Sequence, residues 1–112
     1  MINKNDKNML FLKKDVSFIG DIESHKNVII MGEVEGDIKT DKNLFILDSA
    51  RLHSNVMADN IQINGVVEGH IKASGDILIN KEARVFGDIQ CKSLKMESGA
   101  IYCGDLKIVD SN

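Results

Sequence analysis

The sequence predicts an all-β fold, a single-domain three-sided parallel β-helix (β-solenoid) of about six coils. Three observations lead to it: a short phrase that recurs along the chain, apolar residues two apart around each copy, and an aliphatic core composition. The 112 residues include 43% apolar but only 4% aromatic residues, with no Trp and no Pro. Val, Ile and Leu must therefore fill the core, and β-branched residues favour strands. A chain of this length builds one domain with a core of its own.

The repeated phrase reads apolar, any residue, Gly, polar, apolar. It occurs six times, as FIGDI (18–22), VEGDI (34–38), LHSNV (52–56), VEGHI (67–71), VFGDI (85–89) and YCGDL (102–106). The third positions of successive copies are separated by 16, 18, 15, 18 and 17 residues. Helical hairpin repeats need about 33 to 47 residues, whereas this shorter period fits one coil of a three-sided β-helix with a short strand on each side.

Alternation within each copy predicts which side chains face inward, because residues two apart on a strand point the same way. The inward columns hold Val16, Gly32, Ala50, Gly65, Ala83 and Ala100, then Phe18, Val34, Leu52, Val67, Val85 and Tyr102, then Ile22, Ile38, Val56, Ile71, Ile89 and Leu106, then Ser24, Thr40, Ala58, Ala73 and Cys91. A second phrase adds the pairs Val28/Ile30, Leu44/Ile46, Ile61/Ile63, Ile77/Ile79 and Leu94/Met96. Turn-forming pieces such as HKN and SGD separate the phrases.

The repeat sets the expected domain boundaries. Residues 1–14, rich in Asn and Lys, are expected to form a flexible N-terminal tail, residues 15–109 the β-helix, and residues 110–112 the C-terminal end. The last copy starts at Ala100 and the sequence stops at Asn112, before a complete second phrase. We therefore expect five complete coils and a truncated sixth, whose strands are an open template for pairing.

The phrases GEVEGDIKT (32–40) and GVVEGHIKA (65–73) above all resemble the repeats of the bactofilins, a family of bacterial cytoskeletal proteins. The resemblance covers about 95 residues; the departures are Ser54 in the third copy, the lack of a C-terminal tail and an N-terminal tail without proline. It implies a right-handed β-helix that polymerises head to head and tail to tail without nucleotide. It also implies filaments at the cytoplasmic face of the inner membrane and a role in cell shape or in localising partner proteins.

The two ends of a β-helix expose unpaired backbone groups and a slice of apolar core, so they must be capped or paired with another molecule. Phe18 and Tyr102 are the only aromatic residues of their inward column, and they fall in the two terminal coils. Leu106 and Ile108 belong to the last coil as well. We expect these four residues to form the polymer interface; the alternative for the aromatic rings is that they plug the core.

The tail contains the piece NMLFLKK (8–14). Apolar side chains beside two cations can enter a bilayer interface, and polymerisation would multiply a weak affinity. The predicted membrane-contact residues are Met9, Leu10, Phe11, Leu12, Lys13 and Lys14. In the alternative, these residues cover the first coil.

The residues between the members of the second-phrase pairs should face outward. Three of them, Ile29, Phe45 and Leu78, are apolar, which is more than solubility alone would favour in an outward-facing row. They form a predicted surface for lateral contact with another filament or a partner protein. The alternative is that the tail covers them or that they line another corner of the core.

Polar columns offer little for catalysis or for a cofactor, so we expect a protein that is not an enzyme. The column Asp21, Asp37, Asn55, His70, Asp88 and Asp105 offers oxygen ligands, but it lacks a nonapeptide calcium signature and stacked carboxylates repel. Glu35, His53 and Glu68 align without a second His, which disfavours zinc. Cys91 should face inward and Cys103 outward on another coil, so neither a disulfide nor a catalytic thiol is expected.

Charge and cysteine usage narrow the partners and the compartment. A net charge of −3 gives no basic field for nucleic acid. The N-terminus lacks the apolar segment of about 7 to 15 residues that a secretory signal needs, which predicts reduced thiols in the cytoplasm.

The chain itself is the main expected partner, with membrane lipid and cell-wall or chromosome-segregation proteins as further ones. The competing functions are a non-polymeric adaptor and a hexapeptide-repeat acyltransferase, whose strict period of six the intervals break.

Overall fold

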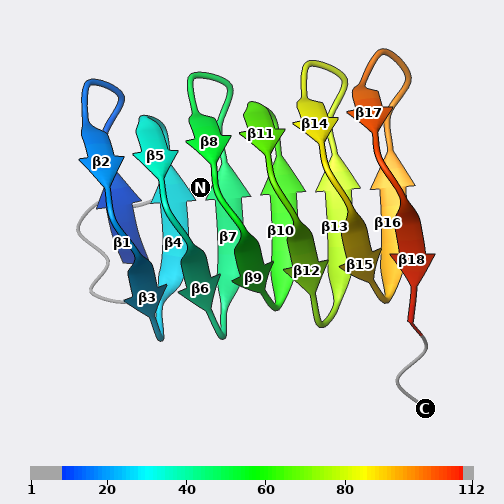
Figure 1. Cartoon of the computed structure of the whole chain (residues 1–112), viewed down its shortest axis with the longest axis horizontal. Coiled ribbons are helices and arrows are strands. Elements are labelled where there is room, and N and C mark those ends of the chain that lie inside the picture. Colours follow the sequence, from blue (N-terminus) through cyan, green and yellow to red (C-terminus); the bar gives the residue numbers. More distant parts are fainter. Residues whose placement is uncertain (1–8, 110–112) are drawn as a thin grey trace.

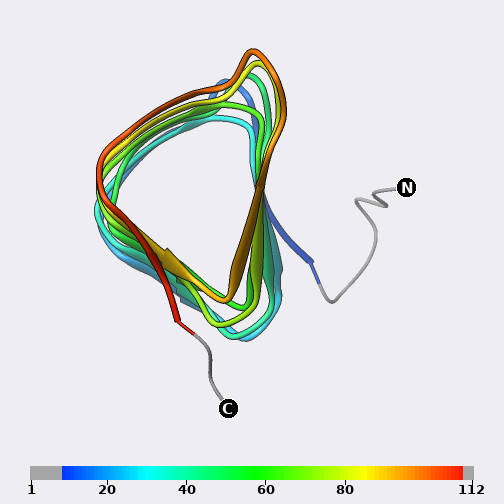
Figure 2. The same ribbon diagram turned by 90° about the vertical axis from the view of Figure 1, so that its right-hand side faces the viewer.

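A computed structural model describes residues 9–109 of the chain and shows eighteen strands in three parallel sheets (Figure 1). Each sheet has six strands, so the predicted three-sided β-helix of about six coils is confirmed. Viewed along the rod, successive coils trace nearly the same three-sided path, and only β1, at the start of coil 1, diverges from it (Figure 2). Within residues 9–109, no helix has the length and apolarity to cross a membrane.

Each coil contributes one strand to each sheet, and coils are numbered 1 to 6 from the N-terminus. Sheet A holds β1 (Met9–Leu12), β4 (Asn27–Ile30), β7 (Asn43–Ile46), β10 (Asn60–Ile63), β13 (Asp76–Ile79) and β16 (Ser93–Met96). Sheet B holds β2 (Ser17–Ile19), β5 (Glu33–Glu35), β8 (Arg51–His53), β11 (Val66–Glu68), β14 (Arg84–Phe86) and β17 (Ile101–Cys103). Sheet C holds β3 (Ile22–Ser24), β6 (Ile38–Thr40), β9 (Val56–Ala58), β12 (Ile71–Ala73), β15 (Ile89–Cys91) and β18 (Leu106–Ile108).

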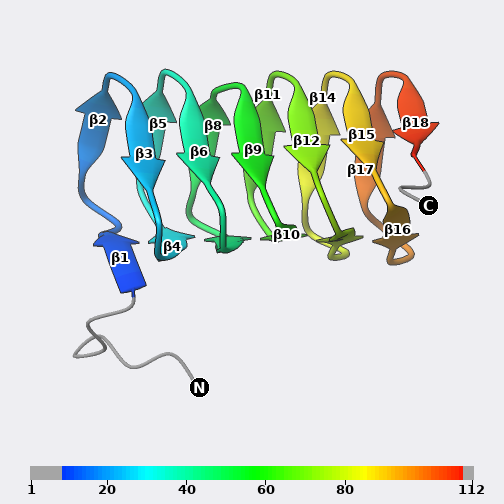
Figure 3. The ribbon, with the colours of Figure 1, turned by 90° about the horizontal axis from the view of Figure 1, so that it is seen from below.

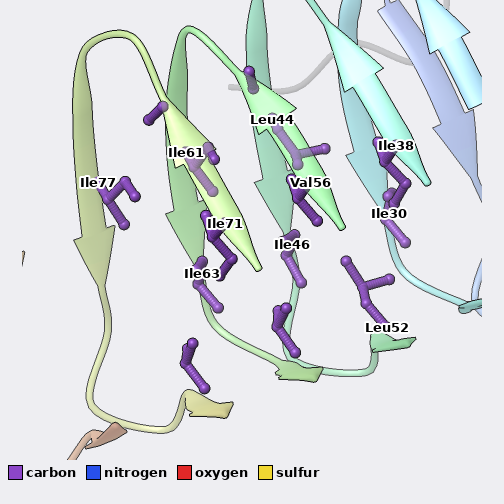
Figure 4. Packing of buried hydrophobic residues seen from close by; sticks show 14 of the residues in the cluster. Ile30, Ile38, Leu44, Ile46, Leu52, Val56, Ile61, Ile63, Ile71 and Ile77 are labelled. Atoms are coloured by element: carbon purple, nitrogen blue, oxygen red, sulfur yellow. The ribbon is translucent and has the colours of Figure 1, made fainter. Parts of the chain in front are cut away.

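The core is a stack of aliphatic side chains inside the three sheets (Figure 4). Ile30, Ile46, Ile63 and Ile79 lie one above another in register in sheet A, and all four are fully buried. Away from the ends of the rod, every residue predicted to face inward is buried. The alternation of apolar and polar residues therefore placed the core correctly, because the strands keep one register from coil to coil.

In five of the six phrases a glycine with positive φ turns the chain from sheet B to sheet C. Gly87 has φ +139°, and a Cβ there would lie 2.0 Å from the carbonyl oxygen of Gly69 on the coil before. Such a backbone conformation and so close an approach both require a residue without a Cβ. Ser54, which replaces glycine in the third copy, does not have a positive φ. The phrase therefore carries glycine because adjacent coils stack backbone on backbone at this corner.

Strand β1 corrects the predicted N-terminal boundary. Residues 9–14 were expected in a flexible tail, but Met9–Leu12 pair in parallel with Asn27–Ile30 of β4. Leu10 and Leu12 pack against the core. Because β1 supplies the sixth strand of sheet A, each coil counted from β1 has three strands. Within the described residues, the last copy of the phrase, β17 and β18, has no sheet A strand after it, as the sequence predicts. Figure 3 shows β1 at one end of the rod and β18 at the other.

Candidate functional site: the two ends of the rod

The C-terminal end of the rod exposes core residues that no further coil of the described chain covers. Leu106 is 44% exposed and Ile108 is 53% exposed, whereas their register partners one coil earlier, Ile89 and Cys91, are each 1% exposed. Met96 is exposed at the same end. The repeat predicts Leu106 and Ile108 at this end, and the structure brings them together on β18.

Backbone donors at the same end also lack partners. In coil 5, the amides of Gly87 and Ile89 donate hydrogen bonds to the carbonyl oxygens of Cys103 and Asp105, each at 2.9 Å. The equivalent amides of coil 6 have no further coil within the described residues to receive them. An end with an apolar centre and free backbone donors is suited to pairing with another strand edge.

The aromatic rings of the two terminal coils both lie against the core. Phe18 and Tyr102 are half-buried and pack on the buried cluster. The Tyr102 hydroxyl donates a hydrogen bond of 2.8 Å to the carbonyl oxygen of Asp105, and burial raises the pKa of the phenol. Each ring therefore covers part of an end while keeping an exposed surface, so plugging the core and contacting a second molecule are compatible roles.

Phe18 also lies at the corner of the N-terminal end. In the neighbouring coil, the site of a Cβ on Gly36 is 2.0 Å from the carbonyl oxygen of Gly20. Among residues 9–109, no coil precedes the corresponding site on Gly20, and its nearest neighbour is the ring of Phe18, at 3.5 Å. With Leu10 and Leu12, this ring gives the N-terminal end a half-buried apolar surface.

Of the residues predicted for lateral contact, Ile29 is not available. It is on the outer face of sheet A, outside the core cluster, yet it is 0% exposed and lies in register between Phe11 and Phe45. Phe45 and Leu78 are half-buried on the same face. A shallow groove of about 430 Å³ runs between them over Gln62. For Phe45 and Leu78, a surface for lateral contact stays a prediction.

The column of acidic residues after the glycine anchors joins neighbouring coils. Asp21 accepts the backbone N–H of Asp37 at 3.0 Å, and Asp88 accepts that of Asp105 at 3.1 Å. Asn55 accepts the backbone N–H of the next coil in the same way. Within residues 9–109, no three His, Cys, Asp or Glu side chains are grouped so that they could hold a metal ion. These oxygens act as hydrogen-bond acceptors between coils.

Each histidine of the chain lies near a carboxylate of the following coil. The Nδ1 atoms of His25 and His53 are 2.9 Å from Asp41 and 3.1 Å from Glu68. The hydrogen bond from His25 lowers the pKa of Asp41. All four side chains are well exposed, so these pairs contribute little to stability. Their position shows that outward polar side chains, too, connect coil to coil.

The two cysteines differ in accessibility, as predicted. Cys91 is buried in β15, and burial together with the Asp76 carboxylate raises the pKa of its thiol. Cys103 is exposed on β17. A maleimide should therefore label Cys103 rapidly and leave Cys91 unmodified in the folded protein, because a buried protonated thiol is a poor nucleophile. Mass spectrometry of the intact chain checks this, and two rapid additions would contradict the burial of Cys91.

The features that stand out along the described chain are its two ends and its coil-to-coil regularity, and they define a β-helix built for stacking. A family model described as Bactofilin, polymer-forming cytoskeletal, matches residues 10–107. The chain belongs to this family. No curated protein and no solved structure matches it.

Proposed function

We propose that the protein is a cytoskeletal scaffold that forms filaments without nucleotide, by end-to-end stacking of β-helices. The observation that carries the proposal is the exposure of core residues at the end of a rod whose inner coils are closed. Leu106 and Ile108 occupy inward positions and yet lie in solvent. Together with the match to a polymer-forming family, this favours a second copy as the natural cover for the end.

Burial of one end contributes a modest free energy, and the same contribution recurs at every junction along a filament. Full burial of a Leu or Ile side chain contributes about 1.5 to 3 kcal/mol, so covering the exposed halves of Leu106 and Ile108 contributes roughly 1 kcal/mol each. Met96 and the surfaces of Tyr102 and Leu94 add to this at the same end. Hydrogen bonds to the free edges fix the register of the two ends. A filament follows because each molecule has two such ends.

Sedimentation and negative-stain electron microscopy of the purified protein test the proposal. Filaments should form in buffer without nucleotide, and added ATP or GTP should leave the amount of pelleted protein unchanged. A uniformly monomeric protein, or polymerisation only with nucleotide, would contradict the proposal. The same preparation separates the filament from a non-polymeric adaptor, which would remain in the supernatant.

A scaffold of this kind would serve cell shape or the localisation of other proteins in the cytoplasm. Repetition along a filament multiplies weak contacts, so outward faces that bind cell-wall or chromosome-segregation proteins would gain avidity from polymerisation. A pull-down with the wild-type chain is compared with one that uses a variant unable to polymerise, such as Leu106→Arg with Ile108→Arg. The comparison distinguishes a partner that needs the filament from one that binds single molecules. Partner binding should fall when polymerisation is lost, and equal binding would favour the adaptor.

Membrane attachment through residues 9–14 is a further part of the proposal. Leu10 and Leu12 pack on the core, so in the folded rod Met9 and Phe11 with Lys13 and Lys14 would make the contact. Replacing Lys13 and Lys14 with Glu should reduce co-flotation of filaments with anionic vesicles at least about fivefold, because each cation contributes about 1 kcal/mol near such a surface. Neutral vesicles are the control, and unchanged flotation with anionic vesicles would remove this segment from the membrane proposal.

A further inference from the structure

The outer face of sheet B carries two parallel rows of side chains, one residue from each coil in each row. The first row is Ser17, Glu33, Arg51, Val66, Arg84 and Ile101. The second row is Ile19, Glu35, His53, Glu68, Phe86 and Cys103. All of these residues are exposed except Val66, which is half-buried. The face is therefore open along the whole rod.

Apolar and charged residues are unevenly distributed over this face. Ile19 is 81% exposed in coil 1, and Ile101 and Phe86 are 45% and 40% exposed in coils 6 and 5. Exposed side chains of this size near both ends of one face exceed what solubility favours. Glu33 in coil 2 and Arg84 in coil 5 lie in the first row, between the terminal coils that carry Ile19 and Ile101, and they have opposite charge.

We propose that this face pairs with the same face of a second copy lying antiparallel to it. A two-fold axis across the face between coils 3 and 4 places coil 1 against coil 6, coil 2 against coil 5, and coil 3 against coil 4. The resulting contacts in the first row are Ser17 with Ile101, Glu33 with Arg84 and Arg51 with Val66; in the second row they are Ile19 with Cys103, Glu35 with Phe86 and His53 with Glu68. No like charges face each other in this arrangement, and each contact occurs twice.

The parallel arrangement of the same two faces lacks this complementarity. With coil n against coil n, Glu33 would meet Glu33 or Glu35 of the second copy, and Arg84 would meet Arg84 or Phe86. Like charges directly opposite each other are destabilising. The distribution of charge along the rod therefore selects the antiparallel pair.

The small area of the face predicts weak pairing of single molecules and firm pairing of filaments. Six strands about 4.8 Å apart, each with three residues of about 3.3 Å, give a face of roughly 290 Å², so two copies bury about 600 Å². Stable complexes bury about 1,200 Å² or more. Two isolated molecules should therefore pair weakly, whereas filaments should pair firmly because the contact repeats at every subunit. In this respect the inference rests on the proposed filament.

A charge swap tests the pairing. Arg84→Glu should lower the fraction of filaments that lie side by side in electron micrographs about tenfold, and Glu33→Arg combined with Arg84→Glu should restore it. Lys72→Glu, on the outer face of sheet C, makes the same change of charge and should leave pairing unchanged. The inference is overturned by single wild-type filaments, by pairing that survives Arg84→Glu, or by a double variant that stays unpaired.

Crosslinking separates this inference from the filament proposal. A chain with Glu35→Cys, Phe86→Cys and Cys103→Ser keeps Glu33 and Arg84 and should form covalent dimers with a short bismaleimide. Each single cysteine should form none, because in the antiparallel pair a residue 35 lies three coils from its copy. The reaction is run on concentrated protein in two versions of this chain: one keeps the wild-type C-terminal end, and the other carries Leu106→Arg and Ile108→Arg, which block end-to-end stacking. Dimers with both kinds of end establish the face even if no filaments form, and their absence from both overturns it.

Discussion

Replacing Gly87 with alanine is expected to destabilise the rod by more than about 4 kcal/mol, at the upper limit of single substitutions. Gly87 has φ +139°, a region that costs an L-residue free energy, and the added Cβ would lie 2.0 Å from the Gly69 carbonyl oxygen. The backbone fixes the position of the Cβ, and the oxygen is itself a backbone atom, so no side-chain rotation relieves the clash. The coils would have to separate at this corner, which breaks the register of sheets B and C. Urea denaturation followed by circular dichroism measures the loss.

Gly20→Ala is the matched control for this prediction. Gly20 has nearly the same φ, +138°, but it is in the first coil, and among the described residues the added Cβ would meet the Phe18 ring alone, at 3.5 Å. That distance is ordinary van der Waals contact, so only the backbone strain of about 1 to 3 kcal/mol remains. The difference between the two variants measures the close stacking of coils. Equal losses would mean that the conformation of glycine, and not the stacking, explains the repeated phrase.

Replacing both Leu106 and Ile108 with arginine is expected to abolish polymerisation while leaving the fold intact. Both side chains are about half exposed in the free rod, so a long cation can extend into solvent there. In a junction the same cations would be buried without partners, which costs about 3 to 5 kcal/mol for each charge. Sedimentation should find the variant entirely in the supernatant, with a melting temperature within a few degrees of the wild type.

Gln90→Arg is the control for added charge. Gln90 is on β15 next to β18, and it lies between the inward residues Ile89 and Cys91, so its side chain faces outward. The variant should form filaments as the wild type does. If the double arginine variant still pelleted, the C-terminal end would not be a polymer interface. If Gln90→Arg also abolished filaments, the loss would reflect charge in general.

The regular part of the fold could be predicted from the sequence because every coil repeats one register. A residue such as Val67 or Ile71 lies directly under its equivalent in the next coil, so the alternation in one phrase describes them all. The predicted difference between Cys91 and Cys103 is confirmed for the same reason. Position in a repeat determines burial once the sheets are closed.

The ends could not be predicted in the same way. Strand β1 lacks the glycine phrase, and its apolar run MLFL reads equally well as a tail segment. Only the pairing with β4 shows that Leu10 and Leu12 complete sheet A. Ile29 was predicted outward from alternation, but alternation cannot show that an outward side chain is covered, and Ile29 is fully buried. Whether an outward side chain is covered depends on segments such as β1 that lie outside the repeat.

The axial rise per subunit in the filament tests the central claim most directly. If β-helices stack end to end, six coils about 4.8 Å apart should give a rise of about 29 Å per molecule, with the 4.8 Å spacing continuing through each junction. Cryo-electron microscopy of filaments formed without nucleotide measures both quantities. A rise larger by about 10 Å or more, or rods lying across the filament axis, would contradict end-to-end stacking.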